Sequence, residues 1–268
     1  MVRGDGRKVF RPLTKSPSYV DRESVLREKG TMRSFGIALR FLTVFPWPRN
    51  PPVALQINQS TPFFPVVGLC LGLLLVLLNR ILEPYVESEI LGVVLVALLI
   101  SATRARHLEG VGRTFDGIRF GDQGSSMAEG RMGIFGLLAV LVVVMLKFRA
   151  VEVMGEMRNQ GLLLAPVLSR WSMVILAYDS RPNLLRINQT MEIEVQGKHL
   201  FWASALTLVL SVLLSGRLAL WIALWVSLLA LIAGWYFQRR LDGVTGYNLG
   251  AMAEISEAFA MVLFASLY

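Results

Sequence analysis

The sequence predicts an all-α membrane protein, a polytopic bundle of about seven transmembrane helices preceded by an interfacial or re-entrant helix. Two observations predict this class. Of the 268 residues, 54% are hydrophobic and only 17% are charged, and the apolar residues are gathered in long runs. About 20 apolar residues are enough to cross a bilayer as a helix. A soluble helical bundle would need polar outer faces, which a run such as 137–146 does not offer.

The chain begins with a segment, residues 1–33, that we expect to be a mobile basic tail. Residues 1–31 carry eight Lys or Arg against four acidic residues and show no periodicity of a helix or strand. Such a composition suits the headgroups of anionic lipids. The following segment, 34–47, is apolar except for Arg40 and is too short to span, so we expect the interfacial or re-entrant helix there. Residues 34–268 form one transmembrane helical domain.

Seven apolar segments are the expected spans. They are 63–78, 90–103, 132–146, 161–178, 200–216, 218–237 and 249–268. Two of them carry ionisable groups at membrane depth, Arg170 in the fourth and Glu254 with Glu257 in the last, and such groups are costly unless they are paired or line a polar cavity. Arg170 is the expected partner of the two acids. The one cysteine, Cys70, excludes a disulfide framework or a thiolate metal site, and we expect it to pack inside the bundle.

The charges between the spans predict the orientation. With a cytoplasmic amino terminus, the inside loops carry five, three and two Lys or Arg residues in 104–131, 179–198 and 238–248. The outside loop 79–89 carries one Arg and three Glu. Only the segment after residue 146 opposes this orientation, with Lys147, Arg149 and Arg158. The expected location is the bacterial cytoplasmic (inner) membrane, with three polar loops meeting at one cytoplasmic face that forms the active face.

The densest polar segment, residues 104–119, follows the second span. Arg106, Glu109, Arg113 and Asp116 are spaced so that a helix would align them as one stripe of alternating charge. This stripe is either a self-paired, solvated face or a site. Three glycines in the segment favour a site, because they weaken a helix and let a ligand approach the backbone.

Acidic residues here and in the last span are candidate metal ligands. His107 stands two residues before Glu109, but a lone histidine in such a segment is more often a hydrogen-bonding group. Carboxylates without cysteine or a histidine pair suit Mg²⁺, which commonly binds together with phosphate. The candidate ligands are Glu109, Asp116, Glu129, Glu254 and Glu257.

Arginines are the candidate phosphate holders. Arg131 stands before the third span, where its guanidinium either binds phosphate oxygens or anchors the helix at the interface. The glycine-rich segment 243–250 lets either a phosphate or a neighbouring helix come close. The expected substrate-binding residues are Arg113, Arg106, Thr245 and Asn248.

With these segments in view, the chain resembles the cobalamin synthase family, the membrane-bound adenosylcobinamide-GDP ribazoletransferases. The family's Phe-Leu-Thr-x-x-Pro-x-Pro and Phe-Phe-Pro-x-x-Gly match residues 41–48 and 63–68, and His-Leu-Asp-Gly-Leu-Ala-Asp-Thr-x-Asp-Gly matches 107–117. Arg-Asp-Ser-Arg-x-Gly-x-x-Gly compares with 128–136, and Thr-Gly-Asp-x-Leu-Gly-Ala-x-x-Glu-x-x-Glu compares with 245–257. The resemblance runs from about Phe35 to the carboxyl terminus.

The resemblance implies a Mg²⁺-dependent phosphotransferase, with residues 34–268 as the catalytic domain. A hydroxyl of α-ribazole, or of its 5'-phosphate, would attack the cobinamide-bound phosphorus of adenosylcobinamide-GDP and release GMP, forming adenosylcobalamin or its phosphate. His107, Asp116 and Arg131 are the expected catalytic residues. The expected partners are these substrates, the lipid bilayer, and a second copy of the chain or other cobamide-assembly proteins. No nucleic acid is expected.

At two positions a family aspartate is replaced by a residue without negative charge. Arg113 and Tyr247 stand where the family has aspartate, while Glu109 and Glu129 are longer acids in place of Asp. An arginine among metal ligands repels a divalent cation. Arg113 therefore either grips phosphate directly, or the chain is a diverged, non-catalytic transporter or assembly partner in which Arg170, Glu254 and Glu257 line a pathway or an interface.

Overall fold

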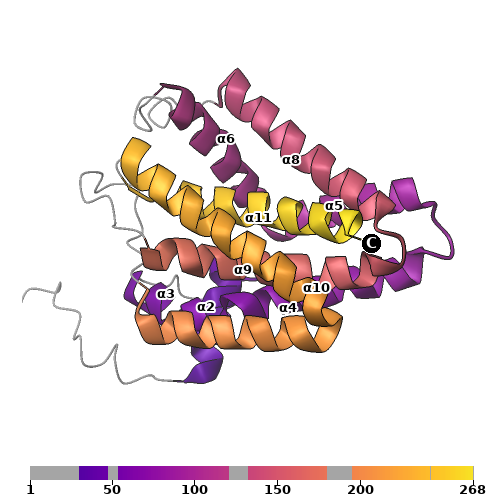
Figure 1. The fold of residues 1–268 in the computed structure, drawn as a ribbon, viewed down its shortest axis with the longest axis horizontal. Helices are drawn as coiled ribbons and strands as arrows, with labels where there is room; N and C mark the ends of the chain where they lie inside the picture. Colours follow the sequence, from indigo (N-terminus) through magenta and orange to yellow (C-terminus); the bar gives the residue numbers. More distant parts are fainter. Residues whose placement is uncertain (1–29, 48–53, 121–131, 180–194, 242, 268) are drawn as a thin grey trace, which may run out of the picture.

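The computed structural model describes residues 30–47, 54–120, 132–179, 195–241 and 243–267. These residues form helices joined by short connections, which confirms the predicted all-α class (Figure 1). The tail predicted at 1–33 lies almost wholly outside them. The helices that correspond to the expected spans are α4 (Phe64–Leu82), α5 (Ser88–Ala102), α8 (Ile134–Val153), α9 (Arg158–Asp179), α10 (Gly197–Arg240) and α11 (Gly246–Ser266).

The amino-terminal helices are short and precede the first span. α2 (Thr31–Leu42) begins inside the segment predicted as the tail and buries Gly36, Ile37, Ala38 and Leu42. It packs against α3 (Ala54–Ser60) and the first span, and a 3₁₀ turn, η1 (Thr61–Phe63), leads into α4. Met32 at its beginning is exposed. A helix of this length with one buried face fits the predicted interfacial or re-entrant position.

Five described helices are long and apolar enough to cross a membrane, and α5 together with the helix after it makes a sixth candidate. α10 covers two of the predicted spans. It is interrupted at Gly216, whose φ of +58° and ψ of −133° are readily adopted only by glycine. Figure 1 shows the chain turning back there, so residues 197–215 and 217–240 are the two arms of a helical hairpin.

α9 is the central helix of the bundle. Within an 18-residue stretch of this span 89% of the residues are buried, against 28% in a stretch of the same length in α8. α9 packs against α4, α10 and α11. Two glycines of α4 permit its backbone to approach that of α9. A Cβ on Gly68 would lie 2.4 Å from the Pro166 carbonyl oxygen, and one on Gly72 would lie 2.4 Å from that of Leu163. Close helix contact through small residues is typical of membrane bundles.

The second span is broken. α5 ends at Ala102, and α6 (Arg106–Phe120) continues at an angle of 86°. Arg104 and Ala105 at the break have φ values of +53° and +54°, which are strained for residues other than glycine. The corner is held to the amino-terminal segment, because Val44 donates to the Ala102 carbonyl at 2.8 Å and Arg104 donates to the Val44 carbonyl at 3.1 Å. The predicted cytoplasmic loop 104–131 is therefore helical as far as Phe120.

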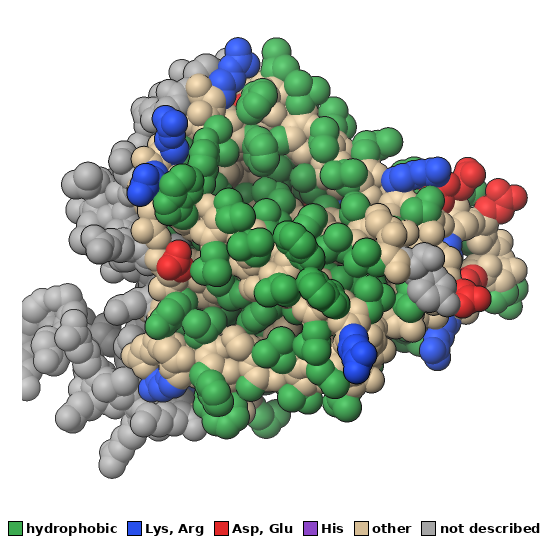
Figure 2. Space-filling view, viewed as in Figure 1, with side chains coloured by type: hydrophobic (Ala, Val, Ile, Leu, Met, Phe, Trp, Pro, Cys, Tyr) green, Lys and Arg blue, Asp and Glu red, His purple; other side chains and the backbone are tan. Residues whose placement is uncertain are grey.

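The visible surface has an apolar middle and charged ends, as expected of a protein that spans a bilayer. Figure 2 shows hydrophobic side chains over the middle of the visible face, with Lys, Arg, Asp and Glu mostly toward the two ends of the bundle. Exposed tryptophans of α10 lie near the ends of its arms, where membrane proteins carry aromatic belts: Trp202 and Trp235 at one end, Trp221 and Trp225 near the turn. Together with the apolar helices, this supports a multi-pass membrane protein.

Two expectations about single segments were wrong. The segment after 146 is not a loop, since α8 continues to Val153. Two of its three basic residues are buried inside the bundle: Lys147 is 1% exposed, and Arg158 donates to the Val151 carbonyl and contacts the Ser88 hydroxyl. They therefore do not oppose the predicted orientation. Cys70 is exposed on α4 instead of packed.

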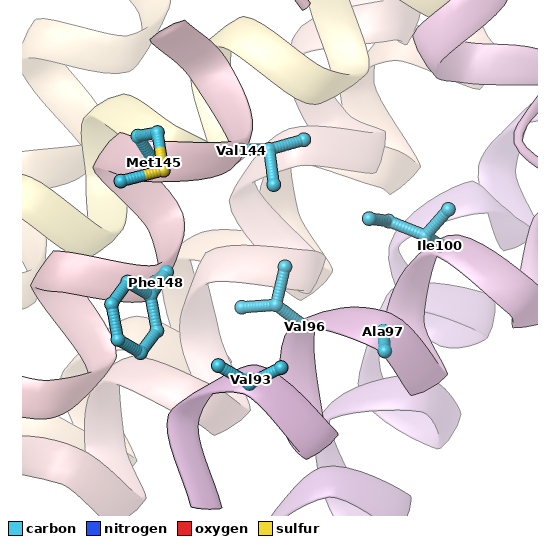
Figure 3. Close-up of a pocket in the computed structure, with 7 residues that line it drawn as sticks. All are labelled: Val93, Val96, Ala97, Ile100, Val144, Met145 and Phe148. Carbon is cyan, nitrogen blue, oxygen red and sulfur yellow. The ribbon is translucent and has the colours of Figure 1, made fainter. Parts of the chain in front are cut away.

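A cavity of about 300 Å³ lies between α5 and α8 (Figure 3). It is lined by apolar side chains alone: Val93, Val96, Ala97, Ile100, Val144, Met145 and Phe148. Since these side chains offer no donor, acceptor or charge, this cavity cannot orient an anionic substrate. A site for an anionic substrate therefore requires the polar residues of α6 and α11.

Candidate functional site

The candidate site lies where α6 packs against the beginning of α11. Gly110 permits this contact, because a Cβ there would lie 2.5 Å from the Tyr247 carbonyl oxygen and 2.9 Å from the Ala251 nitrogen. Gly250 has the corresponding role on α11, where a Cβ would lie 3.2 Å from Cα of His107. The glycines that favoured a ligand site in the sequence thus serve helix packing at these two positions. Two segments 140 residues apart in the chain are thereby joined.

Thr245 and Asn248 begin α11 as a capping box. The Asn248 amide N–H donates to the Thr245 hydroxyl at 3.3 Å, and the Thr245 amide N–H donates to the Asn248 side-chain oxygen at 2.8 Å. The Asn248 side chain also donates to the Thr114 hydroxyl on α6 at 3.0 Å. Both residues are buried. Their contacts hold α11 against α6, so the structure gives them a positioning role and does not test their predicted substrate contacts.

Arg113 and Tyr247, which stand where the family has aspartate, are in contact. The guanidinium carbon lies 4.8 Å from the centroid of the Tyr247 ring, within the range of a cation–π interaction. Arg113 also donates from Nε to Glu109 at 2.8 Å, the i,i+4 pair predicted for the charged stripe. Glu109 remains 44% exposed and Arg106 is exposed at the beginning of α6. The arginine is therefore held from both sides at the edge of the site.

Asp116 connects α6 to the beginning of α8. Its two carboxylate oxygens accept hydrogen bonds from the Gly133 and Gly136 amides, each at 2.7 Å. Asp116 is 1% exposed. A carboxylate at this place satisfies two amides that have no partner within the helix and interacts favourably with the positive end of the helix dipole. The structure thus shows Asp116 as a helix cap.

Glu254 and Glu257 take part in a buried ion cluster, which we define as Lys147, Arg170, Glu254 and Glu257. Lys147 of α8 donates to Glu254 and, at 2.6 Å, to Glu257, and Arg170 of α9 donates to Glu257. All four side chains are at most 3% exposed. The predicted pairing with Arg170 is confirmed for Glu257. Lys147 was predicted only as a basic residue after the third span, although a lysine next to an apolar run is itself a sign that an acidic partner lies nearby.

His107 lies beside this cluster. Its side chain is 10% exposed, and Nδ1 is 4.0 Å from a Glu254 oxygen. This distance exceeds a direct hydrogen bond, and the buried Nδ1 has no partner. Arg131 and Glu129, the remaining predicted site residues, lie outside the described residues.

The described acids do not fit the predicted Mg²⁺ site. Nowhere in the part of the chain that the structure describes do three His, Cys, Asp or Glu side chains form a group suited to a metal ion. Each candidate acid is already engaged: Glu109 by Arg113, Asp116 by two amides, and Glu254 and Glu257 by Lys147 and Arg170. A divalent ion would have to compete with these fixed positive groups for the same oxygens.

Comparison with known proteins covers nearly all of the described helices. A family model for cobalamin-5-phosphate synthase matches residues 34–265. Adenosylcobinamide-GDP ribazoletransferases from Syntrophobacter fumaroxidans and Roseiflexus sp. are 35% and 31% identical to the chain, each over 87% of it and over 98% and 89% of their own lengths. One from Thermosynechococcus vestitus is 33% identical over 85% of the chain and 93% of its own length.

No solved structure matches the chain. The similarity nevertheless extends from α2 to the end of α11 and includes every helix that contributes to the site. Relatives of nearly the same length share it at more than 30% identity. On this evidence the chain is a member of the cobalamin-5-phosphate synthase family.

Proposed function

We propose that this protein transfers α-ribazole, or its 5'-phosphate, onto adenosylcobinamide-GDP in the last assembly step of cobamide synthesis. A ribazole hydroxyl oxygen forms a bond to the cobinamide-bound phosphorus, the bond from that phosphorus to the GMP oxygen breaks, and GMP leaves while the hydroxyl loses its proton. The observation that carries the proposal is the family match over residues 34–265, and two of the segments that resemble the family, 107–117 and 245–257, pack against each other as α6 and the first part of α11.

The residues of α6 supply positive charge where the reaction gathers negative charge. Arg113 is kept in one orientation by Glu109 and Tyr247, so its remaining donors are pre-organised for phosphate oxygens. Arg106 adds a second exposed guanidinium on the same helix. His107 stands one residue further on and supplies the imidazole nearest to these arginines in the chain. Asp116 holds the beginning of α8 against α6.

The test is product formation. Membranes containing the chain, from a host without its own ribazoletransferase, should convert adenosylcobinamide-GDP and α-ribazole into adenosylcobalamin and GMP in equal amounts, measured by chromatography. Equal signals from membranes with and without the chain would contradict the proposal. Uptake of the substrate into proteoliposomes without release of GMP would instead support the transporter alternative.

Dependence on Mg²⁺ belongs to the same proposal, and it rests on the resemblance to the family. Because the described acids are paired, the ion would need ligands from the substrate phosphates or from residues 121–131, which include Asp122 and Glu129. Removal of divalent ions with EDTA should stop the reaction, and added Mg²⁺ should restore it. Full activity in EDTA would remove Mg²⁺ from the proposal and leave the fixed arginines as the source of positive charge.

Arg113 should matter for substrate binding. We expect Arg113→Ala to raise the KM for adenosylcobinamide-GDP roughly tenfold to a hundredfold, because a lost charge-assisted hydrogen bond costs about 1.5 to 3 kcal/mol. The KM of Arg113→Lys should lie between those of Arg113→Ala and the wild type, since lysine keeps the charge but lacks the planar guanidinium. Arg149→Ala, which removes an exposed arginine at the other end of α8, is the matched control and should leave KM unchanged. An unchanged KM in Arg113→Ala would exclude Arg113 as a phosphate holder.

The proposed location is the bacterial inner membrane, with the site at the cytoplasmic face. In a Cys70→Ser background, single cysteines at Arg106 and Gly246 should react with an impermeant maleimide only after the cytoplasmic side is opened. A cysteine at Tyr85, which is 84% exposed between α4 and α5, should react from the outside. Labelling of positions 106 and 246 from opposite sides would exclude the proposed site, because the two segments would then face different compartments.

A further inference from the structure

Lys147 is the one member of the buried ion cluster that was not predicted from the sequence as a site residue or as an ion-pair partner. It lies on α8 between Leu146 and Phe148, and its side chain is 1% exposed. Its ammonium contacts one carboxylate oxygen of Glu254 and one of Glu257, so a single cation bridges two acids on successive turns of α11. A lysine is retained in so apolar a place only if its contacts stabilise it or serve the function of the site.

The cluster is balanced in charge. Two cations, from α8 and α9, face two carboxylates from α11. Lys147 pairs with both carboxylates, and Arg170 pairs with Glu257 alone. Removing Lys147 alone leaves one buried negative charge too many. Removing Lys147 and Glu254 together leaves Arg170 and Glu257 as a complete pair. The balance therefore permits one pair to be deleted without leaving an uncompensated charge.

Glu254 extends from the cluster toward the candidate site. One of its oxygens is held by Lys147, and the other lies 4.0 Å from Nδ1 of His107. A small rotation of the imidazole or one bridging water would complete a hydrogen bond between them. Because a carboxylate only accepts hydrogen bonds, the nitrogen that faces it must carry the proton. The backbone of His107 is fixed in addition by its contact with Gly250.

We propose that Lys147 is a positioning residue: by holding Glu254 beside His107, it fixes the imidazole as the Nδ1–H tautomer and leaves Nε2 as a hydrogen-bond acceptor for the attacking hydroxyl. This inference rests on the proposed function for the identity of that hydroxyl. A carboxylate that orients a functional histidine through Nδ1 is a recurrent arrangement in proteins. Neither Lys147 nor Glu254 needs to touch the substrate.

The tautomer can be measured directly. The chain contains two histidines, so His199→Gln leaves His107 as the single imidazole. Nitrogen-15 NMR of the histidine-labelled variant in bilayers should show the Nδ1–H form, whereas an imidazole free in water favours Nε2–H. Adding Lys147→Met should shift the signal toward Nε2–H. Arg149→Met, which removes an exposed cation from the same helix, is the matched control and should leave the tautomer unchanged.

The balanced double variant separates positioning from stability. Lys147→Met should lower both the melting temperature and the activity. Lys147→Met/Glu254→Met should recover most of the melting temperature, because Arg170 and Glu257 remain paired, but its kcat should stay about 10- to 100-fold below wild type, as is usual when the partner that orients a functional histidine is lost. The KM should change little.

Recovery of kcat together with stability in the double variant would overturn the proposal, because the cluster would then serve only to hold the helices. An Nε2–H form in the presence of Lys147 would overturn it equally. These results are distinct from a failure of the proposed function. In that case the wild-type membranes would form no product, while the tautomer experiment, which needs no substrate, would still read out the effect of Lys147.

Discussion

Replacing Glu257 with alanine should lower the free energy of unfolding by about 3 to 5 kcal/mol, the cost of breaking a buried ion pair from one side. Glu257 is 1% exposed and is the only member of the buried ion cluster that contacts both cations, Lys147 and Arg170. Its loss leaves the Arg170 guanidinium without the carboxylate that it faces. It also removes the carboxylate that joins the Arg170 guanidinium of α9 to the Lys147 ammonium of α8.

The measurement is thermal unfolding in detergent, with Glu152→Ala as the matched control. Glu152 belongs to a surface pair with Arg149 on the same helix as Lys147, and such pairs contribute about 0 to 1 kcal/mol. The double variant Arg170→Met/Glu257→Met should be far more stable than Glu257→Ala, because Lys147 and Glu254 still neutralise each other. Similar melting temperatures for Glu257→Ala and Glu152→Ala would contradict this expectation, because they would show that Arg170 does not need the Glu257 carboxylate for stability.

The second large effect is expected at Asp116. Asp116→Ala removes the acceptor of two amide hydrogens, the partly buried one of Gly133 and the buried one of Gly136, and a buried unsatisfied donor costs about 1 to 3 kcal/mol. The beginning of α8 would move relative to α6. Activity should then fall about a hundredfold, which is the usual cost of misplacing reacting groups by roughly an ångström.

Asp116→Asn distinguishes a helix cap from a metal ligand. Its side chain keeps one acceptor oxygen and the same shape, so a cap should be partly preserved, with stability and activity between those of Asp116→Ala and wild type. If Asp116 instead binds Mg²⁺ during the reaction, as the sequence predicted, Asp116→Asn should fold like the wild type and be as inactive as Asp116→Ala. The two measurements, melting temperature and GMP release, therefore assign the role.

The fold could be predicted from the sequence because a bilayer leaves the chain few alternatives. Each apolar run of sufficient length became a helix, whereas the segment 104–131 was predicted as a loop and is helical from Arg106 to Phe120. The break between α5 and α6 could not be foreseen in the same way. It depends on Arg104 and Ala105 adopting positive φ, which their side chains disfavour, and on hydrogen bonds to Val44 that are 60 residues distant in the chain.

Several predicted site residues have a structural role that the sequence did not predict. Asp116, Thr245 and Asn248 were expected to meet a ligand, but in the structure Asp116 and Asn248 each join two helices and Thr245 caps the beginning of α11. Polar side chains suited to phosphate or metal are the same ones that cap helices, so composition alone cannot separate the two roles. Lys147 illustrates the opposite error. Counting charges within the membrane would have found it, since two acids in the last span require a second cation besides Arg170.

The reversal at Gly216 determines more than the course of one helix. Because no loop separates the two arms of α10, they must enter the bilayer as a unit, and the number of crossings before α11 changes by one if the turn fails to form. Residues 246–250 would then emerge in the wrong compartment, out of reach of α6. Assembly of the bundle thus depends on the turn within α10, which Figure 1 shows at the opposite end of the bundle from the beginning of α11.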